Sequence, residues 1–110
     1  MKTIVYVDDE KALTENFGII FDEDEFKVHT FNSHSDAQGF INGNSVDILF
    51  LDFRMPEGTA IDFLNACSPE CKKILLTGEL DASVEQGVKE SFDLIIEKPF
   101  EIDQILEAVA

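Results

Sequence analysis

The sequence predicts an α/β protein with a parallel β-sheet and helices on both faces of the sheet. Short apolar runs alternate with stretches whose apolar residues recur at helical spacing, and this strand–helix alternation repeats five times along the 110 residues. The run 48–51 is entirely apolar, which is typical of a strand buried on both faces of a parallel sheet. Connections between parallel strands are right-handed crossovers, so the helices are expected to lie on both faces.

Length and charge limit the classes of protein to be considered. We expect one domain over residues 1–110, because 45% hydrophobic content is ordinary for a globular core of this length. The 23 acidic and 8 basic residues give a formal charge of −15, which repels nucleic acid and anionic lipid. No apolar run approaches a membrane span, and a strand follows Met1 directly, which leaves no room for a signal peptide. We therefore expect a cytoplasmic protein that binds neither nucleic acid nor membrane.

The first strand is expected over residues 3–7 and the first helix over about residues 10–23. This helix is predicted by an apolar stripe at spacings of three and four, which would lie on the sheet. The stripe consists of Leu13, Phe17, Ile20 and Phe21.

The second strand and second helix are expected between residues 26 and 43. Residues 26–31 alternate in polarity, which suits an edge strand with His29 at the surface. Ser35 begins a capping-box pattern and is expected to open a short helix that ends before Gly43. His34 is then expected to lie just outside the helix, in solvent.

The third helix is expected between the segment 56–58 and Pro69. Ile61, Leu64 and Cys67 would face inward, and the helix would end before the proline because the residue that precedes a proline is disfavoured in helical geometry.

The last two strand–helix units complete the alternation. Strands are expected at 74–76 and 94–96. A weakly packed helix would begin near Asp81, with an interior glycine that costs about 1 kcal/mol relative to alanine. The final helix would begin near Glu101 and run to Ala110. The apolar contacts expected are Val84 and Val88 for the weak helix, with Gly87 between them, and Ile102, Ile105, Leu106 and Val109 for the final one.

Polar side chains follow four of the five expected strands. Because the carboxyl ends of parallel strands meet at one edge of a sheet, where ligands bind in open α/β folds, these side chains are expected to lie together. They are Asp8 and Asp9 after the first strand, Asp52 after the third, Thr77 after the fourth and Lys98 after the fifth.

The three carboxylates of Asp8, Asp9 and Asp52 predict a cation site. At about 4 Å and an effective dielectric near 20, two such charges repel by roughly 4 kcal/mol. Oxygen ligands alone favour Mg²⁺ or Mn²⁺. Without metal, Asp8→Asn or Asp9→Asn should therefore stabilise the fold. The alternative is an acidic rim that is merely solvated.

With these strand ends, the chain resembles the receiver domain of bacterial two-component response regulators. The resemblance covers essentially the whole chain and is carried by Val7-Asp8-Asp9-Glu10, Leu51-Asp52-Phe53-Arg54-Met55-Pro56, Leu76-Thr77-Gly78 and Glu97-Lys98-Pro99-Phe100. It implies a flavodoxin-like (βα)5 three-layer sandwich with a parallel sheet of order 2-1-3-4-5. It also implies phosphorylation of Asp52 by a sensor histidine kinase or a phosphotransfer protein, with Mg²⁺ as cofactor.

The resemblance also implies roles for the site residues. Asp9 and Asp52 would bind the metal directly and Asp8 through water, and Arg54 is included in the metal site. Asp52 is the expected nucleophile. Thr77 would hydrogen-bond a phosphoryl oxygen and Lys98, before a cis proline bond, would neutralise its charge. A downstream protein target is expected, and the fourth helix, last strand and last helix are the expected surface for this target or for a homodimer.

Two other functions are consistent with some of these residues. Haloacid dehalogenase-type phosphatases use a similar acceptor Asp, hydroxyl and lysine, but they place a second Asp two residues after the nucleophile, where this chain has Arg54. Without that proton acceptor, hydrolysis of an acyl phosphate should be slow, as suits a signal rather than turnover. A receiver-like module that binds proteins constitutively would normally lack an acid or the lysine, and none is missing here.

Three features fall outside the family pattern or the proposed site. Ala60 stands where glycine is usual, and Ile95 stands where the family usually has Tyr or Phe, which puts the usual switch in doubt. Cys67 and Cys71 form only half of a zinc motif, so a packed helix residue and a loop thiol are the simpler interpretation.

Overall fold

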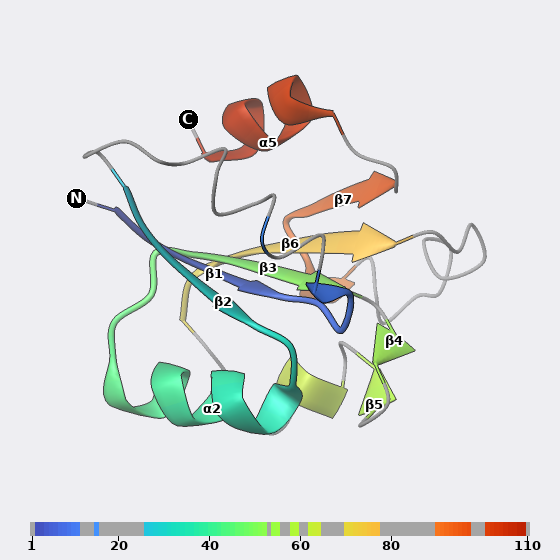
Figure 1. The fold of residues 1–110 in the computed structure, drawn as a ribbon. Helices are drawn as coiled ribbons and strands as arrows, with labels where there is room; N and C mark the ends of the chain where they lie inside the picture. Colours follow the sequence, from blue (N-terminus) through green and yellow to red (C-terminus); the bar gives the residue numbers. More distant parts are fainter. Residues whose placement is uncertain are drawn as a thin grey trace.

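The protein is a three-layer sandwich in which a central sheet lies between helices (Figure 1). This architecture comes from a computed structural model, in which α2 (His34–Gly43) covers one face of the sheet and α5 (Ile102–Val109) the other. The structure describes residues 2–11, 15, 26–52, 54–55, 58–59, 62–64, 70–77, 90–97 and 101–109.

Five parallel strands form the sheet in the order β2-β1-β3-β6-β7. This is the predicted order 2-1-3-4-5, and it puts β2 at an edge as expected. A further pair of two-residue strands, which the sequence did not predict, forms a small antiparallel ladder beyond β3. The strands are β1 (Lys2–Val7), β2 (Phe26–Phe31), β3 (Ile48–Asp52), β4 (Arg54–Met55), β5 (Gly58–Thr59), β6 (Lys72–Thr77) and β7 (Leu94–Glu97).

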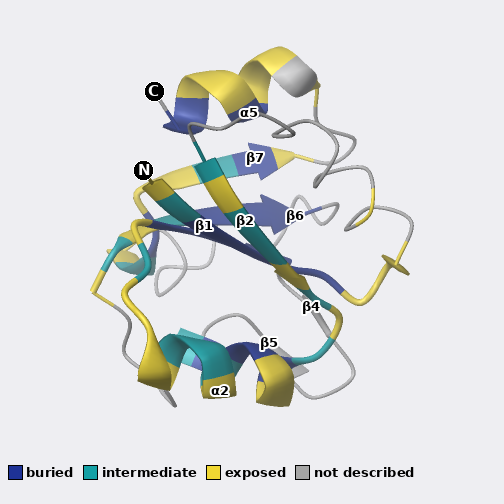
Figure 2. Cartoon of the chain, turned by 60° about the vertical axis from the view of Figure 1, so that its left-hand side comes forward, coloured by how far each residue is buried: buried dark blue, intermediate teal, exposed yellow. Residues whose placement is uncertain are grey.

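Alternation along the central strands sends successive side chains to opposite faces and builds two cores. Val5, Leu49 and Leu75 pack toward α2, whereas Ile4, Phe50 and Ile74 belong to the core that contains residues of α5. Figure 2 shows that burial is concentrated in these central strands, between more exposed helices. No helix within the described ranges is long and apolar enough to cross a membrane.

The beginning of α2 differs from the prediction. Ser33, not Ser35, is the N-cap, and its hydroxyl accepts a hydrogen bond from the Asp36 amide at 3.2 Å. Gly43 is the last helical residue, and Asn44 is the C-cap. The earlier start is favoured because it turns two residues, His34 and Ala37, toward the core at a spacing of three.

The expectation that His34 is solvated is therefore wrong. Its side chain is only 5% exposed, and its ring lies 5.0 Å from the ring of Phe63. Phe63, which the sequence analysis did not single out, is buried in the core beside α2, and Leu64 packs against the same core as predicted. His29 is half-buried rather than free at the surface, because its ring lies 4.3 Å from the ring of Phe40, at a tilt of 35°.

Helix α5 buries a slightly different stripe from the predicted one. Ile105 and Val109 are buried as expected, but Leu106 is 42% exposed and Ala108 takes its place in the core. Ile105, Ala108 and Val109 follow spacings of three and four, so Leu106 falls beside the stripe. Cys71 lies outside regular structure, is not in a disulfide and packs against the core.

Several predicted elements lie wholly or partly outside the described residues. Of the first, third and fourth predicted helices and the residues next to them, the structure describes only short helical pieces, which are Lys11, Glu15, 62–64 and 90–91. The predicted core contacts that are not described are Leu13, Phe17, Ile20, Phe21, Ile61, Cys67, Val84, Val88 and the side chain of Ile102, with Gly87 and the unusual Ala60.

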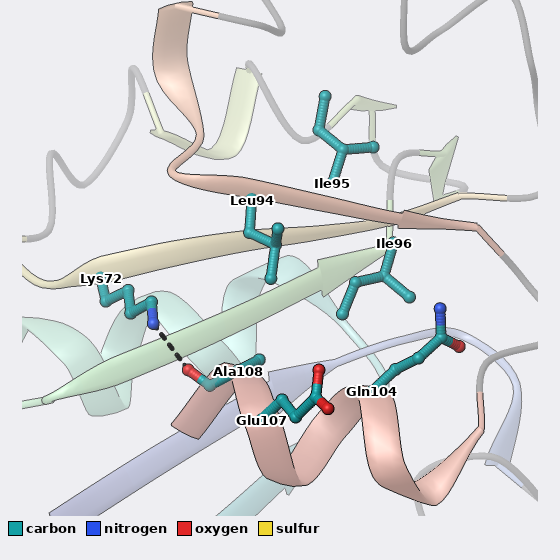
Figure 3. Close-up of a pocket in the computed structure, with 7 residues that line it drawn as sticks. All are labelled: Lys72, Leu94, Ile95, Ile96, Gln104, Glu107 and Ala108. Carbon is teal, nitrogen blue, oxygen red and sulfur yellow. Dashed lines mark hydrogen bonds between the residues drawn. The ribbon is translucent and has the colours of Figure 1, made fainter. Parts of the chain in front are cut away.

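Two lysines from the sheet cap the C-terminal end of α5. Lys2 Nζ donates to the carbonyl of Val109 at 3.1 Å, and Lys72 Nζ donates to the carbonyl of Ala108 at 2.7 Å (Figure 3). The last carbonyls of a helix have no partner within the helix, and cations there are favoured by the helix dipole. The lysines therefore tie α5 to the amino ends of β1 and β6.

Replacing Lys72 by methionine should loosen this attachment. We expect Lys72→Met to lower the free energy of unfolding by about 1 kcal/mol, since a neutral side chain of similar length cannot cap the helix. Chemical denaturation would measure the change. Lys27→Met is the matched control, because Lys27 is also an exposed strand lysine but lies in β2. Equal stability of the two variants would show that the cap contributes nothing.

Candidate functional site

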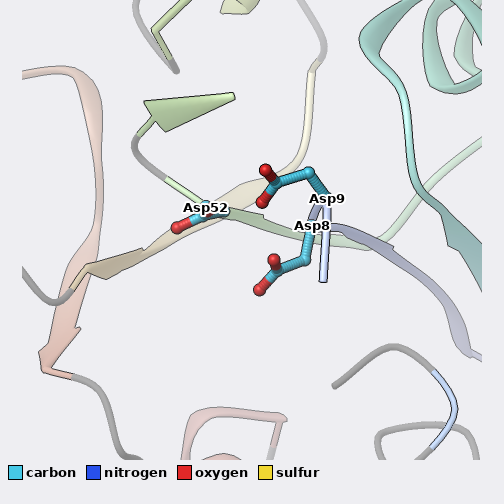
Figure 4. Close-up of side chains that lie close together, drawn as sticks. All are labelled: Asp8, Asp9 and Asp52. Carbon is cyan, nitrogen blue, oxygen red and sulfur yellow. The ribbon is translucent and has the colours of Figure 1, made fainter. Parts of the chain in front are cut away.

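Three carboxylates converge at the carboxyl edge of the sheet. Asp8, Asp9 and Asp52 each place an oxygen within 4.8 Å of the others (Figure 4). Asp8 is fully buried, Asp52 is 9% exposed, and Asp9 is exposed to solvent. The expectation that these three acids lie together is correct.

The strand register explains this convergence. Val7 of β1 is aligned with Leu51 of β3, so the residues that follow them, Asp8 and Asp52, leave the sheet side by side. Asp52 in turn is aligned with Leu76 of β6. Thr77 is the next residue of β6 and is 1% exposed, so its place at this edge is also as expected.

Asp8 is held by hydrogen bonds to both its side chain and its backbone. The Tyr6 hydroxyl donates to Asp8 Oδ2 at 2.8 Å, and the Glu10 amide donates to Oδ1 at 3.0 Å. The Asp8 amide donates to the Phe31 carbonyl at 3.1 Å, and the Asn32 side chain donates to the Asp8 carbonyl at 2.9 Å. Each carboxylate oxygen thus has a donor of its own.

Tyr6 belongs to the site although the sequence analysis did not single it out. It is fully buried, and burial together with the neighbouring negative charge of Asp8 raises its pKa far above the ordinary value. The hydroxyl therefore keeps its proton and acts as a donor. A signal was present in the sequence, because residues two apart on a strand point to the same face and Tyr6 precedes Asp8 by two.

The donor set fits a hard divalent cation. Three carboxylates this close repel each other, and a cation that binds oxygen ligands relieves the repulsion. Mg²⁺ commonly binds one or two protein carboxylates and keeps several waters, and the exposure of Asp9 leaves one side of the cluster open to water.

Two predicted site residues are less fully described. Arg54 begins β4, two residues after Asp52, and is aligned with Thr59 of β5. The chain thus turns into a short antiparallel ladder directly after the carboxylate. Lys98 lies outside the described residues, and the last residue described before it, Glu97 at the end of β7, is aligned with Thr77.

A separate pocket of about 350 Å³ lies between β7 and α5 (Figure 3). It reaches Lys72, the first residue of β6, whereas Thr77 at the carboxylate edge is the last. The pocket is thus displaced from the acids toward the other end of the strands. Its lining residues are Lys72, Leu94, Ile95, Ile96, Gln104, Glu107 and Ala108.

The fold and the site define a receiver domain, and the comparison with known families agrees. The model of the response regulator receiver domain matches residues 4–110, so this chain belongs to that family. The chain is 28% identical over 97% of its length to the alginate biosynthesis transcriptional regulatory protein AlgB of Pseudomonas putida, and 30% identical over 97% to the hydrogenase transcriptional regulatory protein HoxA of Cupriavidus necator. It spans 25% and 23% of these relatives.

Solved structures show the same fold. The response regulator TrrA of Thermotoga maritima aligns over 99% of this chain and 96% of its own, with a TM-score of 0.85 at 24% identity. A CheY-like receiver domain from Methylobacillus flagellatus aligns over 100% and 99%, with a TM-score of 0.87 at 20% identity.

Proposed function

We propose that this chain is a phosphoacceptor that takes a phosphoryl group on Asp52 from a sensor histidine kinase or a phosphotransfer protein, with Mg²⁺. The observation that carries the proposal is the convergence of Asp8, Asp9 and Asp52 at the carboxyl edge of a receiver-family sheet. The Thermotoga maritima regulator was solved in complex with Mg²⁺-BeF, and its similar fold supports a magnesium site in this chain.

Asp52 is the residue best suited to receive the phosphoryl group. Its carboxylate oxygen would attack phosphorus while the bond from phosphorus to the donor breaks and the donor keeps the electron pair. Thr77, buried at the end of the adjacent strand, would donate its hydroxyl to a phosphoryl oxygen. Lys98 would supply positive charge from the segment that follows β7.

Asp8, Asp9 and Asp52 would hold Mg²⁺, and Arg54 would contribute its backbone carbonyl oxygen, because its guanidinium has no acceptor atom. The ion would neutralise negative charge on the transferring group. Without a cation, the three neighbouring carboxylates would repel an incoming phosphoryl group. Their proximity is therefore a reason to expect that phosphoryl transfer requires the metal.

Slow hydrolysis distinguishes this proposal from a phosphatase. A second acid two residues after Asp52 could take a proton from attacking water, but this chain has Arg54 there. We therefore propose a signalling receiver that promotes only its own phosphorylation and dephosphorylation.

The output would be a change in a protein-binding surface. Leu94 of β7 and Leu106 of α5 are 40% and 42% exposed, which supports this part of the molecule as the contact for a downstream protein or a second copy. Ile95 packs against the core on the face of α2. It stands where the family usually has Tyr or Phe, and its aliphatic side chain has few rotamers, so we do not expect the change to involve a large rotation of this side chain. The relatives AlgB and HoxA are named as transcriptional regulatory proteins. For this chain, we still predict that it does not bind nucleic acid directly and that it is cytoplasmic.

Intact-mass measurement with a small phosphodonor tests the proposal. We expect one phosphoryl group per chain in the presence of Mg²⁺ and little uptake when the metal is chelated. The adduct should persist long enough to be recorded, because the acyl phosphate has no adjacent base.

Two results would contradict the proposal. Uptake that is independent of magnesium would remove the metal from the mechanism. Rapid multiple turnover of a phosphomonoester would instead identify a phosphatase.

A further inference from the structure

The hydrogen bond from Tyr6 to Asp8 joins the hydrophobic core to the carboxylate cluster. Tyr6 lies in the core beside α5, where its ring is 6.4 Å from the ring of Phe50 on the neighbouring strand. Its hydroxyl reaches out of this core to Asp8 Oδ2 at 2.8 Å. The ring is thus fixed by packing on both strands, and the hydroxyl is fixed with it.

We infer that Tyr6 is a positioning residue for the metal site, which sets the orientation of the Asp8 carboxylate before the cation binds. The inference rests on the proposed function, because it assigns Tyr6 a part in magnesium binding. Groups that hydrogen-bond a metal ligand fix its orientation and influence affinity even though they do not touch the ion.

The two donors to Asp8 act at opposite oxygens. The Glu10 amide holds Oδ1 from the exposed segment that follows β1, whereas Tyr6 holds Oδ2 from the buried strand. Loss of the tyrosine hydroxyl would remove the donor to Oδ2, so the carboxylate could turn more freely about its Cβ–Cγ bond. A cation held by Asp9 and Asp52 would then find the third carboxylate, that of Asp8, less well ordered.

Tyr6 also gives the site its own optical signal. It is the only tyrosine of the chain, and the chain has no tryptophan. The emission of a phenol depends on whether its hydroxyl is bonded to a free carboxylate or to one whose charge is shared with a metal. Intrinsic tyrosine emission should therefore report magnesium binding directly.

A magnesium titration of Tyr6→Phe tests the positioning role. We expect calorimetry to show about a tenfold loss of Mg²⁺ affinity, the lower end of the range for partners of metal ligands, since the Glu10 amide remains. Ile74→Val is the matched control: it removes volume from the same core but lies on β6, which does not pair with β1, and it leaves the tyrosine hydroxyl. It should bind Mg²⁺ as the wild type does.

The wild-type protein provides a second measurement that needs no variant to fold. Tyrosine emission should change saturably with Mg²⁺, with the midpoint that calorimetry gives. Binding of Mg²⁺ to the wild type without any change in emission, or unchanged or tighter binding by Tyr6→Phe, would overturn the positioning role and leave the proposed function intact. Failure of the wild type to bind Mg²⁺ would overturn both.

Discussion

Asp52→Asn is expected to abolish phosphoryl uptake while the protein stays folded. An amide has no charged oxygen to attack phosphorus, so the nucleophile is lost although the shape of the side chain is kept. The change also removes one of three mutually repelling carboxylates, so the fold should not suffer. Intact mass after exposure to a small phosphodonor and Mg²⁺ would show no adduct where the wild type shows one.

Asp47→Asn is the matched control for this experiment. Asp47 precedes the same strand β3 but lies at its other end, where its carboxylate accepts the Thr3 amide at 2.7 Å. An asparagine oxygen can accept that bond as well. We expect normal uptake by Asp47→Asn, and an adduct on Asp52→Asn would show that another residue is the acceptor.

The strand ends could be predicted because they depend on a short-range pattern and a general rule. Apolar runs such as 48–51 identify buried strands, and parallel strands bring their carboxyl ends to one edge. This rule puts Asp8 and Asp52 at one edge of the sheet. The order 2-1-3-4-5, which makes their two strands neighbours, was implied only by the resemblance to receiver domains.

The beginning of α2 could not be fixed in the same way. Ser33 and Ser35 both offer a hydroxyl near the start of the helix, and local chemistry does not separate them. The choice is made by the core, because a helix that begins at His34 can bury that ring against Phe63. A contact between segments so far apart in the chain leaves no local signal.

Tyr6 was overlooked because a tyrosine within an apolar strand is most simply a core residue. It is a core residue, but its hydroxyl also serves the carboxylate two positions later. The exposure of Leu106 has a different cause. Leu106 follows Ile102 by four residues and Ala108 follows Ile105 by three, so helical spacing allows either residue to face the core, and the packing against the sheet decides between them.

Asp9→Asn and Asp8→Asn are expected to change the metal-free fold in different ways. Asp9 is exposed, so Asp9→Asn relieves repulsion within the cluster and should raise the unfolding temperature. Asp8 accepts hydrogen bonds at both oxygens, and asparagine offers an acceptor to only one of the two donors. A lost bond to a charged group costs about 1.5–3 kcal/mol, which offsets the relief. Asp8→Asn should therefore be no more stable than the wild type, which revises the expectation from sequence.

Saturating Mg²⁺ should make the wild type more stable to heat than the Asp8→Asn and Asp9→Asn variants. A cation that binds only the folded state stabilises the wild type by RT ln(1 + [Mg²⁺]/Kd), and a variant with one ligand fewer gains much less. Thermal unfolding with chelator and with saturating Mg²⁺ would measure both effects. Glu70→Gln is the control for net charge, since it removes one exposed negative charge just before β6, at the other end of the strands. If Asp9→Asn raises the unfolding temperature without metal no more than Glu70→Gln does, then Asp9 does not repel its neighbours. If Mg²⁺ raises the unfolding temperature of Asp9→Asn as much as that of the wild type, then Asp9 does not bind the ion.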